Sequence, residues 1–497
     1  MKVSNSRQRR KKIAKAVMLI HRYFALLMSI IFFAWCFSGF VMIYTNNFPS
    51  VDKFEQAKQK QAIDFSLIAP LSANHFLSDK QIKSLKITTV YNRPSYEVVL
   101  KEDDKRLFFY ADVPHEVPKI DEELAITIAK DFNQMHDAEI AKVELVDELD
   151  KWLPRDGYLK DLPLYKVHFA SDAKRVCYVA KNSGQVVQNL NNWDKFFAWI
   201  GPIPHWFYFK DLRLNTKLWK DVVIYCSLLG LVLCISGIVL GIIRTVNVRK
   251  RRKVLTPFKK GWYKWHHYLG LFFGLFAFTW TLSGLFSMNP WNYSSSRSIT
   301  SEEAGNWRHK PFYTLQEVNE AVEHLKHQAN TTTKSIQLTA FQGGVYWIAD
   351  NSMAKQTALI ASKDFNPKII DTTVIKATIK GFNNTLIQAV KLLEAYDSYY
   401  YSRANKQPLP VYKITMNNAQ NTVYYVDPAS LEIKRKMQTD SRSLRWLYNG
   451  LHSFDFPGLI NNRPLWDIII LFLLIGTTLL SYTGLKLFIG YVWRKLK

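Results

Sequence analysis

The chain has 497 residues, 48% of them hydrophobic and 22% charged, and its 66 Lys and Arg against 41 Asp and Glu give a formal net charge of +25. This composition excludes a collagen-like or an intrinsically disordered chain. So large a positive charge can indicate nucleic-acid binding. We find no basic surface interleaved with aromatic residues, however, and we expect no nucleic-acid partner.

Four apolar stretches are each long enough to cross a bilayer, which takes a helix of ~20 residues. Residues 1–22, 244–264 and 486–497 together hold 21 Lys and Arg and no acidic residue, so most of the excess charge lies beside the ends of these stretches. Because basic loops stay in the cytoplasm, we expect both termini and the middle loop there, next to membrane lipid.

These boundaries predict a membrane α-helical protein with two large exported α+β domains. In chain order the expected segments are a basic N-terminus (1–15), a first span (16–44), a first exported domain (45–218), a second span (219–243), a basic cytoplasmic loop (244–264), a third span (265–288), a second exported domain (289–465), a fourth span (466–490) and a cytoplasmic tail (491–497).

The second half of the sequence repeats the first at a nearly constant spacing. Leu-Pro-Leu-Tyr-Lys at 162–166 returns as Leu-Pro-Val-Tyr-Lys at 409–413, an offset of 247. The same offset relates Trp199 to Trp446, His205 to His452, Trp219 to Trp466 and Gly237 to Gly484. In the first span of each half the offset is 245, which relates His21 to His266 and Ser38-Gly39 to Ser283-Gly284. We infer an internal duplication whose two parallel hairpins form one four-helix bundle.

The exported domains contain patterns of both strands and helices. Residues 121–132 have helical spacing, and Thr314 with Glu317 forms a capping box that opens a helix to about His327. Asn182-Ser183-Gly184 predicts a turn at the far end of a hairpin. Alternating residues predict strands at 98–100, 106–111, 165–170, 175–180, 411–416 and 422–427.

Four histidines form two pairs related by the repeat, His21 with His266 and His205 with His452. The first pair is expected near the cytoplasmic ends of two spans and the second near the opposite surface. An ionisable side chain inside a span needs a partner and usually has a function. In each of the two spans a glycine follows the histidine after close to five helical turns, so it lies on the same helix face. These are Gly39 and Gly284, and they let a bulky planar group approach the helix, a slot to which we also assign Gly237 and Gly484.

Two histidines at each level are what a pair of bis-histidine b-type hemes requires, because neutral imidazole is a common axial ligand of heme iron. Basic side chains near each level are candidate partners of the heme propionates: Arg22 and Lys264 inside, Arg445 and Arg463 outside. A duplication copies packing residues as well as ligands, so histidines that only anchor the span ends are the alternative.

Other chemistry finds little support. There is no CxxCH motif, which excludes the usual covalent attachment of heme. There is also no Walker A loop, no GxGxxG after a strand, no HExxH and no GxSxG, so we expect no nucleotide or flavin domain in this chain. Reducing equivalents would therefore come from a separate donor, either a quinol or a cytoplasmic reductase.

The combined motifs resemble one known family over nearly the whole chain. They are His-Arg-Tyr (21–23) and Trp-His-His-Tyr (265–268) opening spans that close on Ser-Gly, the Leu-Pro-x-Tyr-Lys hairpin followed by Val-Tyr-Tyr-Val-Asp-Pro (423–428), the Trp-x5-His unit and the final Thr-Gly (483–484). The pattern is similar to that of the PepSY-associated transmembrane proteins. The first half departs from it, with Ala180-Lys181 where the second half has Asp427-Pro428.

The resemblance implies a four-span protein of the bacterial inner membrane with periplasmic PepSY-type domains, tied to iron uptake. Its better understood members are heme-containing reductases of ferric siderophores, and the four paired histidines match the family's histidine positions. Our hypothesis is a membrane oxidoreductase that passes electrons through two hemes to a periplasmic ferric chelate, since the oxygen ligands of siderophores hold Fe(III) better than Fe(II). The alternative is a non-redox protein whose PepSY-type domains bind peptides or regulate exported proteases. A transporter is less well supported, because the spans lack paired internal charges.

Overall fold

The computed structural model describes residues 2–45, 48–52, 55–56, 60–102, 106–170, 174–308, 312–326, 333–341, 344–351, 356–361, 372–382, 386–403 and 407–497. The chain divides into two compact units, which we call the helical unit and the sheet unit. The helical unit comprises Met1–Phe48, Phe196–Ser295 and Asp440–Lys497, and the sheet unit comprises Pro49–Lys195 and Ser296–Thr439.

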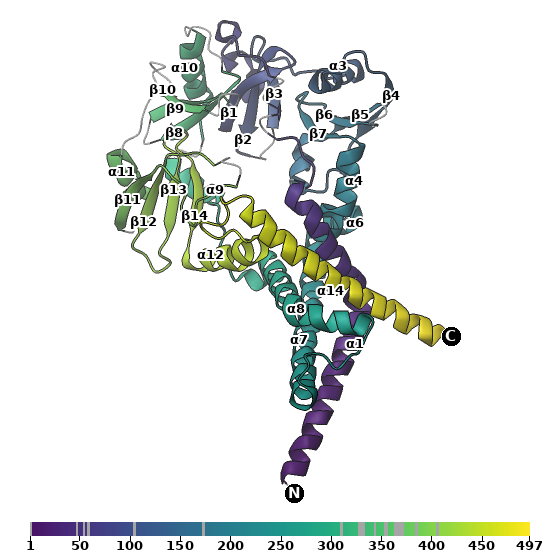
Figure 1. The fold of residues 1–497 in the computed structure, drawn as a ribbon. Helices are drawn as coiled ribbons and strands as arrows, with labels where there is room; N and C mark the ends of the chain where they lie inside the picture. The colour runs from purple at the N-terminus through teal and green to yellow at the C-terminus, as the bar shows by residue number, and fades with distance from the viewer. Residues whose placement is uncertain are drawn as a thin grey trace. The chain divides into compact units, whose positions relative to one another are not determined.

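Four helices of the helical unit are long and apolar enough to cross a membrane (Figure 1). They are α1 (Lys2–Tyr44), α7 (Thr216–Arg252), α8 (Trp262–Ser287) and α14 (Leu465–Leu496). Packing joins α1 to α7, α7 to α8, α8 to α14 and α14 back to α1, so the four form one bundle. The four spans expected from hydropathy are therefore confirmed by helices of sufficient length, and the chain is a multi-pass membrane protein.

Short helices connect these spans to the rest of the chain. They are α4 (Asn192–Ile200), α5 (Pro202–Trp206), α6 (Lys210–Leu214), α12 (Thr439–Leu444), the π-helical turn η6 (Arg445–Gly450) and α13 (Leu451–Ser453). α5 packs on α1, and α13 packs on α8. Both carry one of the predicted histidines, His205 on α5 and His452 on α13.

The sheet unit contains a six-stranded sheet with strands from both of the segments that are predicted to be exported. Its order is β10-β9-β8-β1-β2-β3, with β1 and β8 side by side and antiparallel. The strands are β1 (Ile82–Val90), β2 (Arg93–Leu100), β3 (Arg106–Tyr110), β8 (Ser335–Phe341), β9 (Gly344–Asn351) and β10 (Gln356–Ala361). The two segments predicted to be separate exported domains share this sheet and so form one compact unit.

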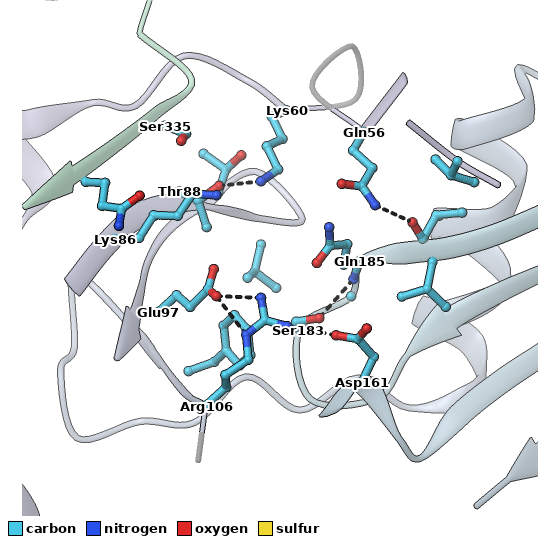
Figure 2. Close-up of a pocket in the computed structure, with 18 of the residues that line it drawn as sticks. Gln56, Lys60, Lys86, Thr88, Glu97, Arg106, Asp161, Ser183, Gln185 and Ser335 are labelled. Carbon is cyan, nitrogen blue, oxygen red and sulfur yellow. Dashed lines mark hydrogen bonds and ion pairs between the residues drawn. The ribbon is translucent and has the colours of Figure 1, made fainter. Parts of the chain in front are cut away.

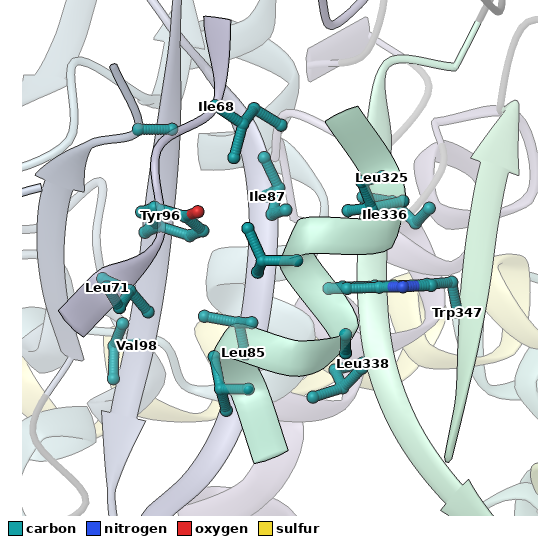
Figure 3. Close-up of a cluster of buried hydrophobic side chains, with 14 of the residues drawn as sticks. Ile68, Leu71, Leu85, Ile87, Tyr96, Val98, Leu325, Ile336, Leu338 and Trp347 are labelled. Carbon is teal, nitrogen blue, oxygen red and sulfur yellow. The ribbon is translucent and has the colours of Figure 1, made fainter. Parts of the chain in front are cut away.

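One face of the six-stranded sheet is a hydrophobic core (Figure 3). Leu85 and Ile87 of β1 and Ile336 of β8 point into it, and all three side chains are fully buried. Helix α10 (Leu315–Lys326) covers this face through residues such as Leu325. The helix begins at the predicted capping box, where the Thr314 main-chain N–H donates to Glu317 at 2.9 Å, and His327 lies outside the described residues.

Two further sheets have the same sequential antiparallel order of four strands. The first contains β4 (Ile140–Val146), β5 (Leu164–Phe169), β6 (Val176–Ala180) and β7 (Val186–Leu190), and the second contains β11 (Ile387–Leu393), β12 (Val411–Met416), β13 (Val423–Val426) and β14 (Ile433–Met437). Helix α3 (Glu122–Asn133) packs on the first sheet and α11 (Thr372–Phe382), beside α9 (Ser301–Arg308), packs on β11. The predicted hairpin at 165–180 is present as β5 and β6, and the predicted turn follows β6, with Gly184 at φ +64°.

In each of these two sheets, an aspartate carboxylate accepts hydrogen bonds from the same two kinds of side chain, a lysine and a tyrosine. Asp150 accepts hydrogen bonds from Lys166 at 2.8 Å and from the Tyr178 hydroxyl at 2.6 Å. Asp397, its equivalent in the second half, accepts from Lys413 at 2.6 Å and from the Tyr425 hydroxyl at 2.9 Å. The other oxygen of each carboxylate accepts main-chain N–H groups just after it in the chain, so both residues fix a turn.

We expect Asp397→Asn to lower the free energy of unfolding by about 2 kcal/mol at pH 7, because it removes the charge that accepts these bonds. Burial acts to raise the pKa of Asp397, but the hydrogen bonds from Lys413 and the main-chain N–H groups of Tyr399 and Tyr400 outweigh it and the pKa is lowered. A lowered pKa gives stability that is present above the unfolded pKa of ~3.9 and is lost as the pH falls through the folded pKa. The difference between the variant and the unmodified protein should therefore shrink below about pH 4.

Denaturant unfolding followed by tryptophan fluorescence, repeated over this pH range, measures that difference. Asp137→Asn, at an exposed position, is the matched control and should unfold like the unmodified protein. Equal stability of Asp397→Asn and the unmodified protein at pH 7 would contradict this account of the carboxylate.

Candidate functional site

The structure brings the four paired histidines together two by two. The ring centroids of His21 and His266 lie 6.3 Å apart, and those of His205 and His452 lie 6.0 Å apart. Each pair takes one histidine from each half of the chain. We call His21 and His266 the first pair, and His205 and His452 the second pair.

The first pair lies inside the four-helix bundle, with His21 on α1 and His266 on α8. Nδ1 of His21 is 3.2 Å from the main-chain oxygen of Leu233 and 3.4 Å from the Ser236 hydroxyl, both on α7. Nδ1 of His266 is 3.0 Å from the Thr483 hydroxyl of α14. Each ring is therefore held by the neighbouring span helix of its own half.

The second pair is held by the same kind of contact. Nδ1 of His205 is 3.0 Å from the Ser38 hydroxyl of α1, and Nδ1 of His452 is 2.9 Å from the Ser283 hydroxyl of α8. Burial lowers the pKa of His205 to about 4, so this imidazole is neutral at neutral pH. Neutral imidazole is the form that binds metal.

Each of the four hydroxyl groups also lies within hydrogen-bond distance of a main-chain oxygen, and this favours one tautomer of the histidines. Ser38, Ser236, Ser283 and Thr483 each donate to the main-chain oxygen three residues earlier on their own helix, at distances from 2.7 to 3.1 Å. A hydroxyl with its hydrogen used in this way accepts the Nδ1–H of the histidine. The proton is then on Nδ1, and Nε2 carries the lone pair with which an imidazole binds metal.

Each of these hydroxyl residues is followed by one of the four predicted glycines. A Cβ on Gly237 would lie 2.8 Å from Cε1 of His21, and a Cβ on Gly484 would lie 3.4 Å from Cε1 of His266. A Cβ on Gly39 would meet Leu474 at 3.0 Å, whereas a Cβ on Gly284 would meet no atom of the described chain within 4 Å. Gly237 and Gly484 thus make room for the imidazole rings themselves.

The second pair is carried by short turns that are anchored to the spans by tryptophan. The turn of His205 ends at Phe207 in the left-handed conformation, with φ 52°, and that of His452 ends at Phe454, with φ 55°. The indole N–H of Trp219 donates to the main-chain oxygen of Trp206 at 2.6 Å, and that of Trp466 donates to Ser453 at 3.3 Å. The first residues of α7 and α14 therefore hold these turns in place.

A cavity of about 420 Å³ surrounds the first pair. It is lined mainly by apolar residues of all four spans, together with Gly237, Gly484 and the arginines Arg22, Arg244 and Arg494. Its volume lies in the range of ~300–1,000 Å³ that is typical of sites for small molecules and cofactors. The guanidinium of Arg22, a predicted propionate partner, lies over the ring of Tyr491 at 5.7 Å.

The two arginines predicted outside have protein partners. Arg445 is only 2% exposed, and it donates to the main-chain oxygen of Asp455 and lies over the ring of Trp446. Arg463 forms an ion pair with Asp467 at 2.5 Å. Lys264, the other basic residue predicted inside, makes no contact with the histidines of either pair within the described part of the chain.

The two pairs lie at opposite ends of the bundle. His21 and Ser38 lie on the same helix, α1, and His266 and Ser283 lie in the equivalent way on α8. A helix rises ~1.5 Å per residue, which separates the pairs by ~25 Å along the helix axis, most of the thickness of a bilayer's hydrocarbon core.

The sequence indicates the four histidines as site residues, but it does not indicate a role for the four hydroxyl groups. Their signal was in the sequence, because each forms a Ser-Gly or Thr-Gly dipeptide that the second half repeats. Of these dipeptides, only the glycines are among the predicted site residues. The donor role of the hydroxyl group depends on helix geometry, and its distance to the imidazole depends on the packing of two helices.

Comparison with models of protein families identifies the family. The model of a family described as PepSY-associated TM region matches residues 18–490. No curated protein matches the chain.

Proposed function

We propose that this chain, which belongs to the PepSY-associated transmembrane family, binds heme b at its two histidine pairs and carries electrons across the membrane to a ferric chelate. The family match supports a membrane protein with PepSY-type domains. The heme, the redox activity and the iron substrate are our proposal, as are the bacterial inner membrane and the cytoplasmic location of both termini.

The observation that carries this proposal is the geometry of the two pairs. A metal ion held between two imidazole nitrogens at about 2 Å from each would separate the ring centres by roughly 6 Å. The measured separations are 6.3 and 6.0 Å. The donor set fits as well, because the relay of hydroxyl and carbonyl groups leaves the proton on Nδ1 in every ring.

Heme iron bound in this way would supply reversible one-electron chemistry. The residues of the chain supply the rest. The Nδ1–H bonds fix the ring planes and make the imidazoles better ligands. The apolar side chains in the core of the bundle, which include Met28, Phe32 and Ala277, would exclude water from the path between the pairs.

The two histidine pairs are separated by ~25 Å along α1, so they would place one electron-carrying heme near each membrane surface. The electron would enter at the first pair from a quinol or a cytoplasmic reductase and leave from the second pair. Reduction of Fe(III) to Fe(II) weakens its hold on hard oxygen ligands, so the chelate would release its iron.

The matched positions also support an internal duplication. The sheets β4–β7 and β11–β14 have the same strand order, the carboxylates Asp150 and Asp397 make equivalent bonds, and the hydroxyl relay occurs twice in each half. We propose that the halves are parallel repeats and that each exported segment contains a PepSY-type domain.

The first test is the absorption spectrum of the protein purified from heme-replete cells. We expect a Soret band and, after reduction, the α and β bands of a low-spin heme. His21→Ala and His452→Ala should each lose about half of the heme per chain, because each removes one ligand of a different pair. The heme content of each variant is measured by pyridine hemochrome.

His267→Ala is the matched control, because this histidine lines the same cavity next to His266 but belongs to neither pair. It should keep the full heme content. A colourless protein from heme-replete cells would refute the proposal and favour the non-redox alternative.

The second test uses the two glycines beside the first pair. In Gly237→Ala the new methyl would lie 2.8 Å from the ring of His21, so the imidazole must shift, whereas in Gly484→Ala the distance of 3.4 Å is close to ordinary contact. Overpacking of this kind costs about 1–3 kcal/mol. We expect Gly237→Ala to change the reduced spectrum and the midpoint potential of one heme, and Gly484→Ala to change them much less. Equal effects of the two substitutions would contradict this assignment of the first pair.

A further inference from the structure

A cavity of about 700 Å³ lies within the sheet unit (Figure 2). It lies on the six-stranded sheet where β1 pairs with β8, the junction of the two exported segments. Lys86 is opposite Gln337 in the register of these strands, and both residues line the cavity. The site is therefore built at the one place in this sheet where the two halves of the chain meet.

The alternation of the strands makes the floor of this cavity polar. Residues of β1 and β8 that alternate with the buried Leu85, Ile87, Ile336 and Leu338 point to the other face of the sheet. The floor residues are Ser84, Lys86, Thr88, Ser335 and Gln337. Hydroxyl, amide and ammonium groups thus replace the aliphatic side chains that fill the opposite face.

Matching turns from the two halves form the walls. Ser183 and Gln185 lie in the turn between β6 and β7, and their equivalents in the repeat, Ser430 and Glu432, lie between β13 and β14. Each half thus contributes one strand to the floor and one turn to the wall, so neither half alone would contain the site.

Two of the basic side chains in the lining are held by carboxylates of the lining itself. Arg106 is fixed by two of them, with Nε 2.8 Å from Glu97 and an Nη 2.8 Å from Asp161. Lys434 is likewise paired with Glu432 at 2.6 Å. These two cations face three carboxylates, and Asp131 is a fourth carboxylate in the lining. The five basic residues of the lining therefore exceed its four acidic residues by one charge.

The remaining lysines of the lining favour an anion. Within the described part of the chain, Lys86 and Lys160 form no ion pair, and both can donate charge-assisted hydrogen bonds to an incoming oxygen anion. Lys60, on the same cavity, donates to the Thr88 hydroxyl at 2.8 Å. The serine, threonine and glutamine side chains add neutral donors and acceptors. The volume is in the range of ~300–1,000 Å³ that suits a small molecule.

We infer that this cavity binds a negatively charged, oxygen-rich small molecule, of the class of polycarboxylate or catecholate chelates. The inference deepens the proposed function by naming a substrate class, and its iron-bound form rests on that proposal. The binding of the anion does not, because it depends only on the residues of the sheet unit. A ferric chelate and a metal-free anion share this chemistry, and the experiment separates them.

The test is isothermal titration calorimetry on the full-length protein in detergent. The probes are ferric citrate, citrate without iron, and a cationic ferric trihydroxamate. We expect saturable binding of ferric citrate, weakened by salt, and little binding of the cationic complex. Lys86→Gln and Lys160→Gln should each weaken binding about tenfold, as the loss of one charged hydrogen bond predicts.

Lys160 is exposed, so its substitution leaves the fold intact, and Lys391→Gln, at an exposed position on β11, is the matched control that should bind like the unmodified protein. No saturable binding of either citrate probe, or equal affinity in the doubly substituted protein, would overturn the inference. Tighter binding of ferric citrate than of citrate would assign the iron-bound form, and the reverse order would assign the metal-free anion.

A ferrous trap added to the chemically reduced protein and ferric citrate separates this inference from the proposed function. Formation of Fe(II) that becomes slower in the doubly substituted protein supports both. Lysine-dependent binding without Fe(II) formation refutes the electron conduit and leaves the site standing. Fe(II) formation at the same rate with and without the two lysines overturns the cavity as the substrate site.

Discussion

The two histidine pairs depend on one hydrogen-bond relay, which runs from an imidazole Nδ1–H to a hydroxyl group and on to a main-chain oxygen of the same helix. A buried imidazole must satisfy its N–H, and inside a membrane bundle water is not available to do so. When the hydroxyl group donates to that oxygen, the histidine is the donor and its proton lies on Nδ1. Each hydroxyl residue is next to a glycine, and at Gly237 and Gly484 the missing side chain leaves room for the imidazole ring. Ring orientation and tautomer are thus one constraint.

In the sheet unit, one strand pairing likewise determines several features. Its six-stranded sheet is closed at the centre by pairing β1 with β8, which removes two exposed strand edges and places an equal number of strands from each half on either side. The hydrophobic face is covered by α10 and the polar face is left to the cavity. A single register, with Lys86 opposite Gln337, therefore determines both which residues form the core and which residues face a ligand.

Much of this could be predicted from the sequence, and the reasons differ from element to element. The spans follow from length and hydropathy, because a bilayer requires ~20 apolar residues whatever the fold. The partners within each histidine pair follow from the repeat offset, since equivalent residues of two parallel hairpins face each other. The pairing of β1 with β8 could not be predicted, because the alternation of residues along a strand does not indicate which strand of the other half lies next to it. The partner of Arg445 could not be predicted either, because its guanidinium donates to the main-chain oxygen of Asp455 in a local turn.

The inferred duplication explains why each site is shared. A single half would bring one histidine to each pair, one strand to the floor of the cavity and one turn to its wall, so its sites would be complete only against a second copy. Fusing the two copies keeps the pairing and frees each half to change. Asp427 shows the result: it accepts from the Ser430 hydroxyl at 2.7 Å and approaches Lys434 at 3.6 Å, while the first half has Ala180 at the equivalent position. The two turns of the cavity wall also differ in charge, because Glu432 stands where the first half has Gln185, and this difference allows the cavity to bind an asymmetric ligand in one orientation.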